Sequence, residues 1–95
     1  MEVYHIMKKF LVIVEVRNIF ILDAEDFTDL MKKVAKEYLT DSSQDLYIKL
    51  LSEITTVQNA VDLYNKFAED VFGIVTAIYE IKSTVYPSDE AIYGR

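Results

Sequence analysis

The stretch MKKFLVIVEVRNIFIL, from Met7 to Leu22, decides the fold, because it resembles an export signal and also two strands of a sheet. An export signal needs a basic start, about 7 to 15 apolar residues and a small-residue cleavage site. The first apolar run, FLVIV, ends at Glu15, and no A-x-A-like site follows it. A membrane-spanning helix needs about 20 apolar residues, and the chain has no such run. The sequence therefore predicts no membrane segment and a cytoplasmic protein.

The same stretch fits two β-strands. Residues at even positions, from Phe10 to Val16, form an apolar row at period two, and most of them are β-branched. The odd positions are mostly polar: His5, Lys9, Glu15 and Arg17 are polar, with the apolar Leu11 and Ile13 between them. The polar pair Arg17-Asn18 separates the two apolar runs, and asparagine tolerates the positive φ of a tight turn. The sequence therefore predicts a hairpin that turns at Arg17-Asn18.

After Leu22 the apolar residues recur at helical spacing. Asp23 is a suitable N-cap, and further acidic residues occupy the first turn, where the helix dipole favours them. Apolar residues then follow at intervals of three and four from Phe27 to Tyr38. We expect a helix from about residue 24 to 39 and a loop over TDSSQ at 40–44.

Two interpretations compete from residue 45 onward. In the first, residues 46–54 form a strand and Thr55 caps a helix that ends at Gly73, in the left-handed position that favours glycine. A last strand then covers residues 74–86 and stops at Pro87. One face of that strand is expected to carry Val75, Ala77, Tyr79, Ile81 and Val85.

In the second interpretation, one long helix spans about residues 44 to 82. Apolar residues from Tyr47 to Ile78 alternate at spacings of three and four, which is typical of a coiled-coil seam. The pair Thr55-Thr56, the β-branched content of residues 74–85 and the glycine at 73 favour the first interpretation.

We therefore predict one α+β domain over residues 1–86, in the order ββαβαβ, with two helices on one face of a four-stranded sheet. Residues 87–95 are expected to form a short, acidic, mobile tail. The alternative is a mostly α fold built on the long helix.

Composition excludes several classes of function. A net charge of -6 argues against direct nucleic-acid binding, which normally needs a basic surface. The chain has no cysteine, one histidine and two glycines, so it lacks a thiolate metal site, a multi-histidine site and a glycine-rich phosphate loop. We predict no catalytic residue and no cofactor. The absence of Trp and Cys, with many Ile, Lys, Asp and Tyr, suits an AT-rich microbial or viral genome.

Acidic residues around the start of the first helix are the sharpest chemical candidates. Asp23, Asp26 and Asp29 could together hold Mg²⁺ or Mn²⁺ for phosphoryl-transfer or nuclease chemistry. Acids at a helix N-terminus are common for capping and dipole reasons alone, and we prefer that interpretation.

Aromatic and apolar residues outside the expected core favour a binding function. Leu63 and Phe67 fall off the main apolar stripe of their helix, and the tail carries Ile92 and Tyr93. Because tyrosine and phenylalanine are favoured at interfaces, these four residues are candidates for contact with a protein partner, including a second copy in a homodimer. The sequence thus favours a small acidic interaction, accessory or inhibitory protein. A metal-dependent enzyme and a small-molecule sensing domain are the alternatives.

Overall fold

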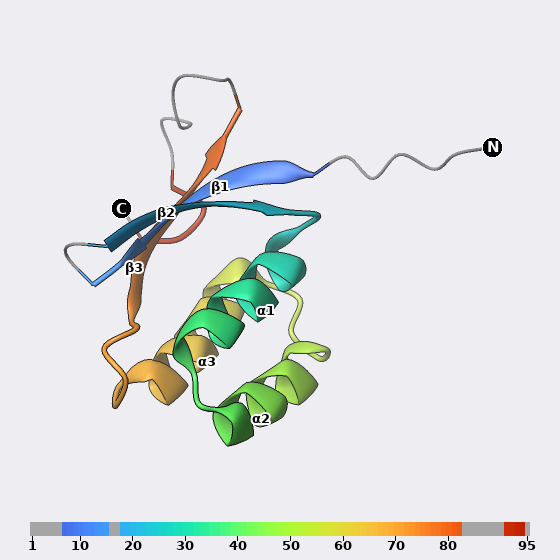
Figure 1. Ribbon diagram of the computed structural model, residues 1–95. Helices are drawn as coiled ribbons and strands as arrows, with labels where there is room; N and C mark the ends of the chain where they lie inside the picture. The colour runs from blue at the N-terminus through green and yellow to red at the C-terminus, as the bar shows by residue number, and fades with distance from the viewer. Residues whose placement is uncertain (1–6, 16–17, 83–90, 95) are drawn as a thin grey trace.

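A computed structural model describes residues 7–15, 18–82 and 91–94, and this part of the chain forms a small α+β domain, as predicted (Figure 1). The elements in chain order are β1 (Lys8–Val14), β2 (Asn18–Ala24), α1 (Phe27–Tyr38), α2 (Asp41–Leu51), α3 (Val57–Ala68) and β3 (Val75–Ile81). Among the described residues the order is therefore ββαααβ with three strands, so the predicted order ββαβαβ with four strands is wrong.

The predicted hairpin is confirmed. β1 pairs with β2 in antiparallel register from Lys8 opposite Ala24 to Val14 opposite Asn18. Asn18 therefore already belongs to β2, and a positive φ of 56° falls on Glu15 instead. The other predicted turn residue, Arg17, and the N-terminal residues before Met7 lie outside the described residues.

The sheet has the order β2-β1-β3 and is antiparallel throughout. Even-numbered residues of β1 point to the side of the helices, where Phe10, Val12 and Val14 are at most 3% exposed. α1 and α3 lie beneath this face, and α2 packs against both of them on the side away from the sheet (Figure 1). The core is thus built between one sheet face and one helical layer, and α2 completes it from below.

The first helix begins later than predicted. Asp23 and Ala24 still pair with β1, so the N-cap is Asp26 rather than Asp23. The Asp26 carboxylate accepts a hydrogen bond of 2.9 Å from the backbone N–H of Asp29, which satisfies one of the free donors of the first turn. The helix then ends at Tyr38, within a residue of the predicted end.

The predicted strand over residues 46–54 is wrong, because α2 occupies most of it. This helix starts inside the predicted loop at 40–44, with Thr40 as its N-cap. Tyr47 and Leu51 lie four residues apart on the face that packs on the core, and they are 0% and 1% exposed. A short run rich in apolar residues fits either a strand or a helix, and here the packing of Tyr47 and Leu51 on the core decides for the helix.

The alternative of one long helix over about residues 44 to 82 is also wrong. α2 stops at Leu51, and α3 begins with a cap of its own, in which the Thr56 hydroxyl accepts a hydrogen bond from the N–H of Asn59. The predicted last strand exists as β3, whose bounds Val75–Ile81 fall inside the predicted 74–86. Residues 83–86 of that prediction lie outside the described residues.

β3 does not carry one continuous face of odd-numbered residues. Val75 lies opposite Val14, but Ala77 lies opposite Ile13, so Thr76 is an extra residue in the β3 ladder. Because one inserted residue exchanges the two faces, Val75 points to the core and Ala77 to the opposite side. The expected common face is therefore wrong for Val75, whereas Ala77, Tyr79 and Ile81 share the opposite face and Val85 lies outside the described residues. Buried Ile78 takes the place beneath the sheet expected for Ala77.

The turn between α3 and β3 places the left-handed residue one position early. Phe72 has a φ of 57° and is 82% exposed, whereas Gly73 was predicted to adopt this conformation. Gly73 is needed for space: a Cβ there would lie 2.8 Å from Tyr38 Cβ and 3.0 Å from the Tyr64 hydroxyl. The Tyr64 hydroxyl donates a hydrogen bond of 2.7 Å to the Gly73 carbonyl, which anchors the turn to the core.

Two buried tyrosines join the helices. Tyr47 of α2 and Tyr64 of α3 meet edge to face with ring centroids 5.8 Å apart, and both are fully buried. The Tyr47 hydroxyl donates to the Ala60 carbonyl at 2.7 Å, so neither hydroxyl lacks a partner. Burial raises the pKa of both phenols well above the ordinary value. No helix in the described part of the chain is long and apolar enough to span a bilayer.

Candidate interaction surface

The face of the sheet opposite the helices is apolar on all three strands. Its side chains alternate with those that enter the core, and Figure 1 shows the helices gathered on the other side. Two of them, Ile19 and Ile21 of β2, are 62% and 61% exposed. Of the other residues on this face, Ala77 is buried at 6% exposure and the rest are partly buried. We call the following six residues the open face: Leu11, Ile13, Ile19, Ile21, Ala77 and Tyr79.

The open face has an unusual composition for a sheet surface in water. An antiparallel sheet with one solvated face normally alternates apolar and polar residues, whereas near-continuous apolar runs are typical of strands that are buried on both faces. FLVIV in β1 and IFIL in β2 are runs of the second kind. The first polar row lies at the end of the open face, where Lys9 and Asp23 form an exposed ion pair of 3.1 Å.

The outer edge of β3 is occupied by the chain itself. The Ile78 N–H donates to the Tyr93 carbonyl at 3.0 Å, and the Ile92 N–H donates to the Ile78 carbonyl at 2.8 Å. The Tyr93 hydroxyl donates to Asp62 of α3 at 3.1 Å and accepts from Asn65 at 3.3 Å. Burial and the neighbouring Asp62 carboxylate raise the pKa of Tyr93. The candidate contacts Ile92 and Tyr93 thus lie against their own sheet and helix.

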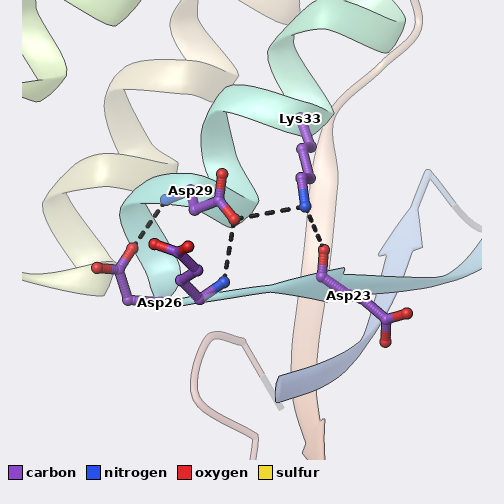
Figure 2. A network of polar contacts seen from close by, with 5 residues as sticks. Asp23, Asp26, Asp29 and Lys33 are labelled. Atoms are coloured by element: carbon purple, nitrogen blue, oxygen red, sulfur yellow. Dashed lines mark hydrogen bonds and ion pairs between the residues drawn. The ribbon is translucent and has the colours of Figure 1, made fainter. Parts of the chain in front are cut away.

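The outer edge of β2 is open. Because Ile78 directs its N–H and C=O away from β1, alternation along the ladder places the outward groups of β2 on Ile19, Ile21 and Asp23. The Asp23 carbonyl accepts a hydrogen bond from Lys33 of α1 (Figure 2). Within the described part of the chain, no group bonds the outward N–H and C=O of Ile19 and Ile21.

The three candidate metal ligands serve the junction between β2 and α1 instead of converging on one point (Figure 2). Asp29 accepts a hydrogen bond of 3.0 Å from the Glu25 N–H and lies 3.4 Å from Lys33 Nζ. The Glu25 hydrogen bond and the positive charge of Lys33 hold the pKa of Asp29 below its usual value. Asp26 caps the helix, and the Asp23 side chain turns away toward Lys9. The described residues contain no group of three side chains placed to share a metal ion.

A small pocket lies between β2 and α1 on the helix side of the sheet. Its volume is about 170 Å³, and the Phe20 and Tyr38 rings meet edge to face beside it, with centroids 5.9 Å apart. The pocket is lined by Val12, Val14, Phe20, Leu22, Lys33, Val34, Glu37 and Tyr38. On the helix face, the side chains of β2 are therefore less tightly covered by the helices than the side chains of β1.

The two helix residues predicted to contact a partner are half-buried. Leu63 and Phe67 pack against the core, and the Phe67 ring lies 6.0 Å from that of Tyr47. The exposed residues Ile19 and Ile21 were not predicted as interaction residues. One signal could have identified them. Along both strands of the hairpin the odd-numbered residues are largely apolar, as the even-numbered residues are, so both faces of the hairpin are apolar.

The comparisons with known proteins add no relative. No protein-family model matches the chain, and neither the curated proteins nor the solved structures gave a significant match. Inferences about function therefore rest on the geometry of this chain alone.

Proposed function

We propose that this protein acts by binding another protein through the open face of its sheet. The observation that carries the proposal is the exposure of Ile19 and Ile21, at 62% and 61%, within a face that is apolar on all three strands. Contiguous apolar surface on a small domain marks a binding site, because each square ångström removed from water contributes about 25 cal/mol.

The geometry gives less support to the alternatives. An enzyme that uses Asp23, Asp26 and Asp29 would need carboxylates that converge, whereas these side chains engage separate backbone and lysine partners. A sensing domain would need a ligand pocket of about 300 Å³ or more. The pocket beside Phe20 has only about 170 Å³, and a second pocket lined in part by Phe10 and Phe27 has about 200 Å³.

The test compares three baits in affinity capture from the cells that naturally make the protein. The first bait is the unmodified chain, and the second is the double variant Ile19→Thr/Ile21→Thr, which keeps β-branched residues but removes apolar surface. The third is Leu46→Gln/Leu50→Gln, a matched control on α2, where these leucines are 49% and 37% exposed. Circular dichroism and a melting curve verify that all three are folded.

We expect the unmodified chain and the α2 control to retain the same partner, and the Ile19/Ile21 variant to lose it. If the Ile19/Ile21 variant retains the partner in equal yield, the open face is not the binding site. If the α2 control loses it as well, the contact lies on the helical side of the molecule.

A further inference from the structure

We propose that two copies of this chain pair through the outer edges of their β2 strands, antiparallel, with a twofold axis at Phe20. The two sheets would then form one continuous six-stranded sheet. This inference concerns the backbone edge of β2, and it does not depend on a partner at the open face.

The outer edge of β2 has two residues with unpaired backbone groups, followed by one residue whose carbonyl is already bonded. Ile19 and Ile21 direct their N–H and C=O outward without a partner in the described part of the chain, whereas the next outward carbonyl, that of Asp23, accepts from Lys33. An unpaired apolar edge strand is a template for another strand, and natural proteins normally block such an edge. Here Lys33 blocks its end and leaves two residues available.

A second copy of β2 satisfies these groups in a register centred on Phe20. When Ile19 of one copy lies opposite Ile21 of the other, each of the two symmetric pairs exchanges two N–H···O=C hydrogen bonds. A register centred on Ile21 would place Ile19 opposite Asp23 and require Lys33 to release the Asp23 carbonyl. A shift by one residue would bring the open face of one copy beside the helix face of the other.

The side chains of this register are also compatible. On the open face, the isoleucines form β-branched cross-strand pairs, which stabilise a sheet. On the helix face, the two Phe20 rings meet at the axis, beside the pocket of about 170 Å³ that Phe20 and Tyr38 line. The segment from Asn18 to Leu22 carries no charge, so like charges do not oppose each other along the paired strands.

The test uses the absence of cysteine in the chain, which makes every introduced thiol unique. The register places Asn18 opposite Leu22 of the second copy in a non-hydrogen-bonded pair, with Cα atoms about 4.5 Å apart, within disulfide range. Asn18→Cys and Leu22→Cys are made as separate chains and oxidised alone and mixed. Two copies of position 18 would lie about 13 Å apart, too far for a disulfide.

We expect a covalent dimer of one Asn18→Cys chain and one Leu22→Cys chain in the mixture, and little dimer from either variant alone. Equal cross-linking in all three samples would exclude this register. Absence of cross-linking in the mixture, with both variants folded by their melting curves, would exclude the paired edge.

Sedimentation of cysteine-free chains provides a second test. Ile21→Pro removes an outward N–H while the hydrogen bonds of β2 to β1 remain, because proline is tolerated at an edge strand where its nitrogen faces solvent. Two of the four proposed hydrogen bonds would be lost, and the dimer dissociation constant should rise at least about tenfold. Ile19→Thr/Ile21→Thr should remain dimeric, because it leaves the backbone intact.

The outcomes separate the two proposals. A folded Ile21→Pro chain that dimerises like the unmodified chain, or an unmodified chain that is monomeric, would overturn the edge dimer and leave partner binding at the open face untouched. Loss of the partner without loss of the dimer in Ile19→Thr/Ile21→Thr would support both.

Discussion

The two faces of the sheet are made of the same strands and nearly the same residue types, yet they have opposite environments. On the helix face, Val12 and Val14 are fully buried. On the open face, one residue away along the ladder, Ile19 and Ile21 remain more than 60% exposed. Hydrophobicity therefore does not decide which face becomes core. The helices cover only one of the two faces, so the apolar residues of β2 on the other face stay exposed.

The largest expected effect is on the helix face. Phe10→Ala should lower the free energy of unfolding by about 3–5 kcal/mol, because Phe10 is 3% exposed and the cavity left behind cannot fully collapse. Urea unfolding followed by circular dichroism measures the loss. A loss below about 1 kcal/mol would show that the helix face is much more loosely packed than its burial indicates.

A smaller loss is expected beneath the helix face, at Tyr64. Tyr64→Phe leaves the Gly73 carbonyl without its buried donor and should cost about 1–3 kcal/mol at neutral pH. Burial raises the pKa of Tyr64 and Tyr47, so the unfolded chain releases these protons at lower pH than the folded chain. Stability should therefore be complete below about pH 10 and fall as the pH rises above it.

Urea midpoints at pH 7 and pH 10.5 check this prediction. The variant keeps only Tyr47 of the two fully buried phenols, so its stability should fall less steeply between the two values than that of the unmodified chain. Equal slopes would mean that Tyr64 does not contribute to the alkaline loss.

The hairpin and the first helix could be predicted from sequence because their signals are local. Alternation sets the strand faces, and an acid near the start of an apolar period marks a helix cap. The hairpin needed one correction, at Asn18, and the helix one, at Asp26. The error at the helix is small, because a second aspartate three residues on performs the same capping role. At the hairpin the positive φ falls on Glu15, three residues before Asn18.

The segment after residue 40 could not be predicted, because its fate depends on distant contacts. Tyr47 and Leu51 favour a helix there only because α1 and α3 provide a surface on which both side chains are buried. The insertion at Thr76 is likewise set by pairing with β1 and has no local signature. In the turn before β3, Gly73 is required for the close approach of Tyr38, which lies on another helix.

The candidate site was the least predictable part. The sequence analysis singled out acidic and aromatic residues, whereas the exposed surface consists of two ordinary isoleucines on the strand at the edge of the sheet. Exposure is a property of the assembled layers, so Ile19 and Val12 differ in the structure far more than in any local pattern.

A moderate effect is expected at the junction that places α1 beneath the sheet. Asp26→Ala removes the cap of α1 and should cost about 0.5–2 kcal/mol. Thr40→Ala is the matched control, because Thr40 is the N-cap of α2 but makes no side-chain hydrogen bond there. Thermal unfolding of both variants measures the difference, and an equal cost at the two caps would contradict the capping role of the Asp26 carboxylate.

The smallest effect is expected on the open face itself. Ile19→Thr/Ile21→Thr should change the free energy of unfolding by less than about 0.5 kcal/mol per site, because exposed positions away from caps and polar networks tolerate substitution. Threonine keeps the β-branched shape that suits a strand. The measurement is urea unfolding beside Phe10→Ala at one protein concentration. A loss comparable to that of Phe10→Ala would mean that these isoleucines are covered in solution. The two faces would then both be buried, one by the helices of the same chain and the other by a second molecule.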